Sequence, residues 1–332
     1  MRFVIPGGTG QIGRILDRAL TEEGHEVLVL TRRPRADREL YWDGRTLGRW
    51  AEAVDGADAV VNLAGRSVNC RYTDANQREM LHSRVDSARV VGEAIAAAKR
   101  PPRVWLQMST ATIYSHHFGA PHDEESGVLG GGEPDVPRYW DFSVDIAKAW
   151  ERAQELSPTP QTRKVALRCA MVMSPDRGGA FDMMLRLARC GLGGPIGGGS
   201  QYMSWIHDRD LVRAVRFLLD REELAGPVNL AAPHPVAQRA FMQAIRRAWG
   251  IPVGLPATRW MAEVGAFALR SDTELLLKSR TVVPGRLQEA GFGFEHPQWP
   301  AAAVDLARRR RWRPARSSPA SSPAPRTPDP GT

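Results

Sequence analysis

The sequence contains few cysteines and no long apolar run. Its three cysteines, Cys70, Cys169 and Cys190, are odd in number and widely spaced, so we expect neither a disulfide framework nor a paired-cysteine zinc site. The first apolar run stops at Pro6, which makes it too short for the core of a signal peptide. No stretch approaches the length of a membrane span. We therefore expect a reduced, cytoplasmic protein without a membrane partner.

The body of the chain also lacks a strong excess of either charge. The net charge is +8, and +6 of it belongs to residues 308–332, which hold seven arginines and one aspartate. That segment is rich in proline and serine and poor in apolar residues, so we expect a disordered basic tail. Such a tail can touch RNA or an anionic surface. Because the body is nearly neutral, we expect no specific nucleic-acid partner.

Short apolar runs alternate with amphipathic helical patterns through the first half of the chain. Buried strands that are separated by helices predict a doubly wound parallel α/β sheet. The pattern loosens near residue 175, which predicts a smaller lobe that binds the substrate. The predicted domains are 1–174, 175–307 and the tail 308–332. The apolar runs are 2–6, 26–31, 58–65, 103–110 and 164–173, and two of the helical patterns are 12–23 and 140–156.

Glycine recurs at every third position directly after the first apolar run. Gly7, Gly10 and Gly13 stand between the strand predicted at 2–6 and the helix predicted at 12–23. Glycine lets the backbone turn tightly and approach a pyrophosphate, and the helix N-terminus offers N–H groups to that anion. The pattern predicts a dinucleotide site, and an ordinary structural turn is the alternative.

No acidic residue follows the second predicted strand, where an NAD site usually places one to hold the ribose hydroxyls. Thr31, Arg32 and Arg33 occupy this position. Guanidinium groups pair well with phosphate, so these residues favour NADP over NAD. The alternative is that both arginines are only solvated.

The chain resembles the short-chain dehydrogenase/reductase superfamily, and within it the atypical epimerase-family proteins with a characteristic C-terminal domain. This resemblance implies a Rossmann sheet, a bound NADP and a small-molecule substrate between two lobes. Gln11 departs from the family pattern, which usually has an aromatic residue there. The resemblance rests on GGTGQIG (7–13), TRRP (31–34), YWDG (41–44), VVNLAG (60–65), HSRV (82–85), and the long segments 191–212 and 275–297.

The resemblance also implies a set of cofactor contacts that extends beyond the glycine turn. They fall in the turn, at the ends of the second and third strands, on the following helix and after the later strand. The implied contacts are Gly7, Thr9, Gly10, Gln11, Ile12, Gly13, Thr31, Arg32, Leu63, Ala64, Glu79, Arg84 and Val172.

The chain lacks the tyrosine and lysine, one helical turn apart, that usually supply a proton in this superfamily. Alignment on Glu151 places Ser143 and Ala147 at those two positions. The remaining candidates surround the carboxyl end of the strand at 103–110. They are Ser109, Thr110, Tyr114, His116 and His117. We select Ser109, Tyr114 and His116, with a packed ring as the alternative for Tyr114 and a surface position as the alternative for His116.

No metal site is predicted, because His116, His117 and His122 have no diagnostic spacing. In the second half, Trp205 and His207 either line the substrate cleft or anchor the second lobe.

The sequence as a whole predicts an NADP-dependent oxidoreductase or epimerase that acts on a small polar substrate, sugar-like or a carbonyl compound. The missing tyrosine–lysine pair leaves an alternative, a catalytically silent protein that senses NADP(H). A homodimer is possible.

Overall fold

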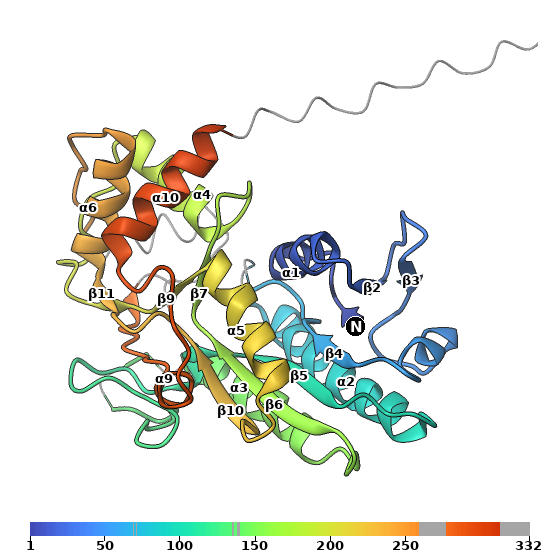
Figure 1. Cartoon of the computed structure of the whole chain (residues 1–332). Helices are drawn as coiled ribbons and strands as arrows, with labels where there is room; N and C mark the ends of the chain where they lie inside the picture. Colours follow the sequence, from blue (N-terminus) through green and yellow to red (C-terminus); the bar gives the residue numbers. More distant parts are fainter. Residues whose placement is uncertain (69, 71, 135, 138–139, 259–276, 313–332) are drawn as a thin grey trace, which may run out of the picture.

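A parallel sheet of seven strands forms the centre of the computed structural model (Figure 1). The structure describes residues 1–68, 70, 72–134, 136–137, 140–258 and 277–312. Every neighbouring pair of strands is parallel, in the order β3-β2-β1-β4-β5-β6-β10. The doubly wound α/β fold expected from the apolar runs is therefore confirmed. The strands are β1 (Arg2–Pro6), β2 (Glu26–Thr31), β3 (Glu39–Tyr41), β4 (Ala59–Asn62), β5 (Val104–Thr110), β6 (Arg163–Cys169) and β10 (Gly226–Leu230).

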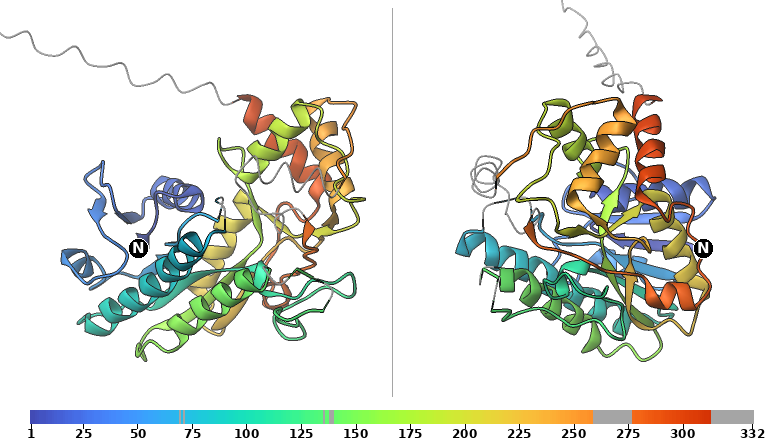
Figure 2. Two further views of the ribbon diagram at one scale, coloured as in Figure 1. Left: turned by 180° about the vertical axis from the view of Figure 1, so that it is seen from behind. Right: turned by 90° about the vertical axis from the view of Figure 1, so that its left-hand side faces the viewer.

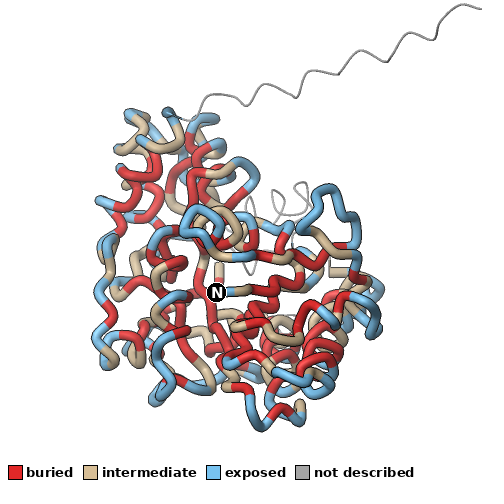
Figure 3. Tube along the Cα trace, turned by 45° about the vertical axis from the view of Figure 1, so that its right-hand side comes forward, coloured by how far each residue is buried: buried red, intermediate tan, exposed pale blue. Residues whose placement is uncertain are grey.

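Helices cover both faces of this sheet, as Figures 1 and 2 show. Helices α1 (Gln11–Glu22) and α5 (Asp208–Asp220) pack together on one face. Helices α2 (Asp74–Ala97) and α3 (Asp141–Glu155) pack together on the other. The buried residues follow the strands and the inner sides of the helices (Figure 3), so the main core lies against both faces of the sheet. Two short 3-10 helices, η1 (Arg49–Ala53) and η2 (Ala111–Ile113), complete this part.

A second hydrophobic core holds a group of helices beside the sheet. Phe241 and Trp299 stack at its centre, with ring centroids 3.8 Å apart, and Trp205 packs edge-on against Trp299 at 4.8 Å. The helices are α4 (Ala180–Arg189), α6 (Gln238–Trp249) and α10 (Trp299–Trp312), and the short helix α9 (Gly285–Glu289) lies against β10. Two small sheets pair β7 (Met171–Met173) with β9 (Trp205–His207) and β8 (Tyr202–Met203) with β11 (Val236–Ala237).

The structure differs from the sequence-based expectation at three places. The apolar run at 164–173 is two strands, because the chain leaves the central sheet after Cys169 and β7 pairs with β9 instead. Strand β10 lies beyond residue 174, yet it pairs with β6, so the central sheet does not end at the predicted domain boundary. Helix α10 continues to Trp312, so residues 308–312 of the expected disordered tail are helical. Residues 313–332 lie outside the described part of the chain.

Among the described residues, none of the helices combines the length and the apolar character that crossing a bilayer requires.

The stacked pair in the second core predicts a clear contrast between two tryptophans of α10. Trp299 is fully buried and its indole N–H donates to the Phe241 carbonyl at 2.9 Å, whereas Trp312 is 82% exposed. We expect Trp299→Ala to lower the free energy of unfolding by about 3–5 kcal/mol, through the lost contacts and the cavity. Trp312→Ala should change it by less than about 0.5 kcal/mol. Urea denaturation measures both, and equal effects would contradict the packing described here.

Candidate functional site: a groove at the switch point of the sheet

The first βα turn lies against the end of β4, where the strand order reverses. Gly7 has a φ of +75°, and a Cβ there would lie 2.8 Å from the Cα of Ala64. A Cβ on Gly13 would lie 2.2 Å from the carbonyl oxygen of Gly8. A Cβ on Gly10, in contrast, would meet nothing closer than the Gly7 oxygen at 3.5 Å. The outer two glycines are therefore needed to form the turn, and Gly10 leaves space in front of it.

The N-terminus of α1 has the features of an anion-binding site. Gly10 is its N-cap, no side chain accepts a hydrogen bond from its first turn, and no acidic residue lies in that turn. By comparison, the Thr73 side chain caps α2. The first N–H groups of α1 therefore lack a protein cap, and the helix dipole favours negative charge there.

Three adjoining pockets form one groove along this edge of the sheet. The arginine pocket has a volume of 820 Å³, the central pocket 670 Å³ and the inner pocket 430 Å³. The arginine and central pockets share Thr9, Thr31 and Arg32. The central and inner pockets share Leu63, Gly65 and Arg66. The groove therefore runs from the end of β2, across the glycine turn, to the ends of β5 and β6.

The structure brings the predicted cofactor contacts together in this groove, except for Gly13, which packs behind the turn. Those in the central pocket are Gly7, Thr9, Gly10, Thr31, Arg32, Leu63, Ala64 and Glu79. Those in the inner pocket are Gln11, Ile12, Leu63, Arg84 and Val172.

Arg84 is a half-buried cation that lacks a carboxylate partner among the described residues. Its guanidinium donates to the Met80 carbonyl at 2.9 Å and lies over the Trp150 ring, 5.0 Å from the centroid. Desolvation lowers the pKa of Arg84 to about 10, so the group stays charged at neutral pH. Glu79, the other predicted contact on α2, is paired with Arg66. A partly desolvated cation without a carboxylate partner favours an anionic ligand in the inner pocket.

Ser109 begins a polar network that runs from the inner pocket into the protein. Its hydroxyl donates to Glu151 on α3 at 2.6 Å, and the same carboxylate accepts two hydrogen bonds from Arg168 on β6, at 3.0 and 2.9 Å. Arg168 also donates to the Tyr114 hydroxyl at 3.0 Å, which donates to the Asn229 side-chain oxygen at 3.0 Å. Burial opposes the charge on Arg168, but Glu151 outweighs it and raises the pKa of the guanidinium. The network fixes Ser109 at the wall of the groove.

Tyr114 and His116, the other two predicted catalytic residues, do not line the groove. Tyr114 is 2% exposed, its hydroxyl both donates and accepts inside the core, and burial raises its pKa. The Nδ1 atom of His116 accepts a hydrogen bond from the Ser279 N–H at 2.9 Å, and burial together with Lys278 lowers the pKa of its ring. This placement supports the packed-ring reading of Tyr114 and gives His116 a contact with the C-terminal segment.

Sequence reasoning missed several residues of the groove. Trp42 and Asp43 line the central pocket. The sequence analysis used the YWDG motif that contains them for the family resemblance and assigned it no contact with the cofactor. Tyr72 lines the inner pocket and packs edge-on against Phe142 at 5.9 Å. No local pattern marks Tyr72, because its position depends on how the loop after β4 meets α3. Thr110 lines the inner pocket beside Ser109, as the ends of parallel strands predict.

The fold and the groove define the class of this protein, a Rossmann-type α/β protein of the short-chain dehydrogenase/reductase kind. The chain belongs to the NAD dependent epimerase/dehydratase family, whose model matches residues 3–231. A second family model, a domain of unknown function named DUF1731, matches residues 259–306. Both halves of the resemblance inferred from the sequence are thereby confirmed.

Curated relatives and solved structures agree with this assignment. The chain is 36% identical to the epimerase family protein SDR39U1 of Bos taurus over 92% of its length and 99% of the relative. The crystal structure of human SDR39U1 with NADPH superposes with a TM-score of 0.81 at 32% identity, covering 93% of this chain and 99% of that one. A nucleoside-diphosphate sugar epimerase from Corynebacterium glutamicum gives a TM-score of 0.72 at 25% identity, covering 93% of this chain and 58% of that one.

The network behind Ser109 yields a stability prediction. Glu151→Gln removes the partner of the buried Arg168, whose side chain is 8% exposed, and should lower the free energy of unfolding by about 3 kcal/mol. The control is Glu93→Gln in the exposed pair with Arg89, which should change it by less than about 0.5 kcal/mol. Urea denaturation of both variants measures the difference. A loss at Glu151 no larger than the loss at Glu93 would show that the buried pair contributes little.

Proposed function

We propose that this protein is an NADP(H)-dependent oxidoreductase or epimerase that acts on a small polar carbonyl or sugar-like substrate. The observation that carries the proposal is the position of Arg32, which lines both the arginine pocket and the central pocket. A guanidinium there pairs with a phosphate on the adenosine ribose, where an NAD site would have a carboxylate. The NADPH bound in the structure of human SDR39U1 supports the same choice.

The residues present fit a dinucleotide. The uncapped start of α1 and the open space in front of Gly10 suit a pyrophosphate, because a Cβ at Gly10 would project where close approach is needed. Thr31 and Arg32 would hold the adenosine side, and Leu63 and Val172 would flank the nicotinamide. When bound, the nicotinamide exchanges a hydride with a substrate carbon.

Ser109 orients the substrate oxygen. Its proton is donated to Glu151, so its free lone pairs accept a hydrogen bond from a substrate hydroxyl. Glu151 also accepts two hydrogen bonds from Arg168, so its carboxylate is held in place and fixes the serine rotamer. Thr110, beside Ser109, offers a second hydroxyl to the same pocket. Proton exchange with the substrate oxygen then falls to the Thr110 hydroxyl or to water in the open pocket.

The inner pocket favours an oxygen-rich or anionic substrate. Arg66 and Arg84 line it together with the hydroxyl groups of Ser109 and Thr110. Arg84 contributes a positive charge that has no carboxylate partner in the described part of the chain, whereas Arg66 is already paired with Glu79. Sugar hydroxyls, carboxylates and phosphates satisfy such groups, and purely apolar carbonyl compounds do not.

A second function, cofactor sensing without chemistry, is favoured by one specific observation. On α3, Ser143 lines the inner pocket where relatives of this superfamily usually have the proton-donating tyrosine. Ala147, at the position of the usual lysine, is fully buried. A protein that binds NADP(H) and releases it unchanged would need neither group.

Cofactor preference tests the first half of the proposal. Arg32→Ala should weaken NADPH binding by roughly 10–100-fold, since a hydrogen-bonded charge pair is lost, and change NADH binding by less than about 2-fold. Isothermal titration calorimetry measures both constants. Arg189→Ala, an exposed arginine on α4, is the control and should bind both cofactors like the parent chain. Equal affinity of the parent chain for NADPH and NADH would refute the preference.

Oxidation of NADPH by a substrate distinguishes an enzyme from a protein that only senses the cofactor. NADPH absorbance is followed with a panel of sugar-like, carboxylated and simple carbonyl compounds. We expect Ser109→Ala to lower kcat by about 100-fold while NADPH affinity stays within about 2-fold of the parent value. Ser126→Ala, on an exposed loop, is the control. Tight NADPH binding with no turnover of any compound would favour the sensor, and unchanged kcat in Ser109→Ala would remove Ser109 from the mechanism.

A further inference from the structure

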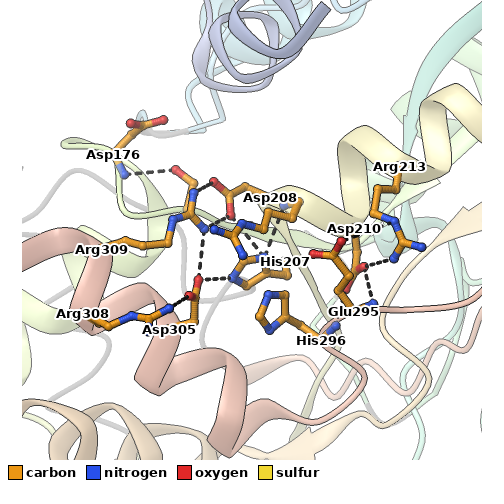
Figure 4. A network of polar contacts seen from close by, with 12 residues as sticks. Asp176, His207, Asp208, Asp210, Arg213, Glu295, His296, Asp305, Arg308 and Arg309 are labelled. Carbon is orange, nitrogen blue, oxygen red and sulfur yellow. Dashed lines mark hydrogen bonds and ion pairs between the residues drawn. The ribbon is translucent and has the colours of Figure 1, made fainter. Parts of the chain in front are cut away.

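Two histidines and an aspartate meet away from the groove, where three segments of the chain converge (Figure 4). His207 ends β9 and caps α5, and its Nδ1 accepts the Arg209 N–H at 3.2 Å. His296 lies in the segment that leads to α10, and Asp305 lies on α10 itself. None of the three lines the arginine, central or inner pocket. His207 therefore belongs to the contact between the two cores rather than to the substrate cleft.

The three side chains bring their ligand atoms close together. The Nε2 atom of His207 lies 3.2 Å from a carboxylate oxygen of Asp305. One ligand atom from each residue lies within 4.8 Å of the other two. The two imidazole rings are close, with centroids 3.7 Å apart and planes inclined by 30°.

One imidazole has an unsatisfied nitrogen. The Nε2 atom of His296 is buried and has no hydrogen-bond partner among the described residues, whereas the Nε2 atom of the fully buried His207 faces only the Asp305 carboxylate oxygen, 3.2 Å away. Leaving a buried polar atom without a partner is costly, so the His296 nitrogen indicates an absent ligand or a functional role.

We propose that His207, His296 and Asp305 bind one divalent transition-metal ion, of which Zn²⁺ is the natural representative. Neutral imidazole and carboxylate are typical zinc ligands, and three protein ligands leave a fourth position for water. The sequence analysis considered only His116, His117 and His122 as metal ligands, and the proposed site uses none of them. It is independent of the cofactor groove.

The surroundings also offer a group that could orient the ring. Coordination through Nε2 requires the ring proton on Nδ1, where an Asp208 carboxylate oxygen 3.2 Å away can accept it in place of the contact that Nδ1 makes with the Arg209 N–H. Arg309 forms two hydrogen bonds of 2.7 Å with Asp208, which anchor its guanidinium. Asp305 accepts one hydrogen bond from Arg308 at 3.0 Å and one from Arg309 at 3.2 Å, and a carboxylate has about four acceptor sites.

Binding the ion requires a movement of His296. Tetrahedral zinc with bonds near 2.1 Å separates its ligand atoms by about 3.3 Å. The His207–Asp305 distance of 3.2 Å already matches this value, whereas the half-buried His296, whose ring lies nearly face to face with that of His207, has to turn and move closer. An open hollow of 340 Å³ is lined by Asp208, Glu295 and Arg309, which are neighbours of the site. The bound ion would join the start of α5, the segment that leads to α10, and α10 itself.

Zinc binding to the full chain tests the site. The protein is treated with a chelator, dialysed and titrated calorimetrically with Zn²⁺, and the visible spectrum of bound Co²⁺ reports tetrahedral coordination. We expect one ion per chain. His296→Phe keeps a ring in place and leaves the helix-capping His207 untouched. It should weaken binding by roughly 100-fold or more, since the loss of a ligand costs at least as much as the loss of a residue that only orients a ligand.

The matched control is His117→Phe, because His117 also has a buried unsatisfied nitrogen and lies beside another histidine, with its ring 4.0 Å from that of His122. Zinc affinity should be unchanged in this variant. Asp305→Asn, a second variant, should also weaken binding. Absence of binding to the parent chain, affinity that survives His296→Phe, or affinity lost in His117→Phe would overturn the proposal.

Discussion

The groove depends on one close approach of backbone to backbone, between the turn after β1 and the end of β4. A side chain at Gly7 would collide with Ala64, and one at Gly13 would collide with Gly8. Because neither position carries one, α1 can start immediately beside β4 and direct its N–H groups along the switch point. The three pockets meet around this contact, so any change that separates β1 from β4 would disrupt the whole groove.

The inner pocket of the groove, where Ser109 lies, depends on a different kind of interaction, a buried polar network. Ser109 is held by Glu151, which is held by Arg168, and Arg168 reaches the hydroxyl of Tyr114. These residues come from β5, α3, β6 and the loop after β5. The position of one groove hydroxyl therefore depends on side chains that the substrate does not touch. Tyr114 supports the site from within the core, in the packed position that the sequence analysis gave as its alternative.

The features predicted correctly from the sequence are those that depend on neighbouring residues in the chain. The glycine spacing identified the turn, and the apolar runs at 2–6, 26–31 and 103–110 match β1, β2 and β5. Strand β10 was missed because its five residues, GPVNL, carry little signal until β6 provides an edge for pairing. Tyr72 was missed because only the folded loop brings it to the inner pocket. Interactions between distant segments decide both cases, and a single sequence does not display them.

The basic run at 308–311 shows how composition can mislead. Four consecutive arginines favour a solvated segment, yet Arg309 pairs with Asp208 and Arg310 pairs with Asp182. Both aspartates are almost fully buried, so each needs a cation, and α10 supplies one to each. The arginines thus complete acids that lie about 100 residues or more earlier in the chain. Two of the four charges of this run therefore stabilise buried contacts of α10, one with α5 and one with α4.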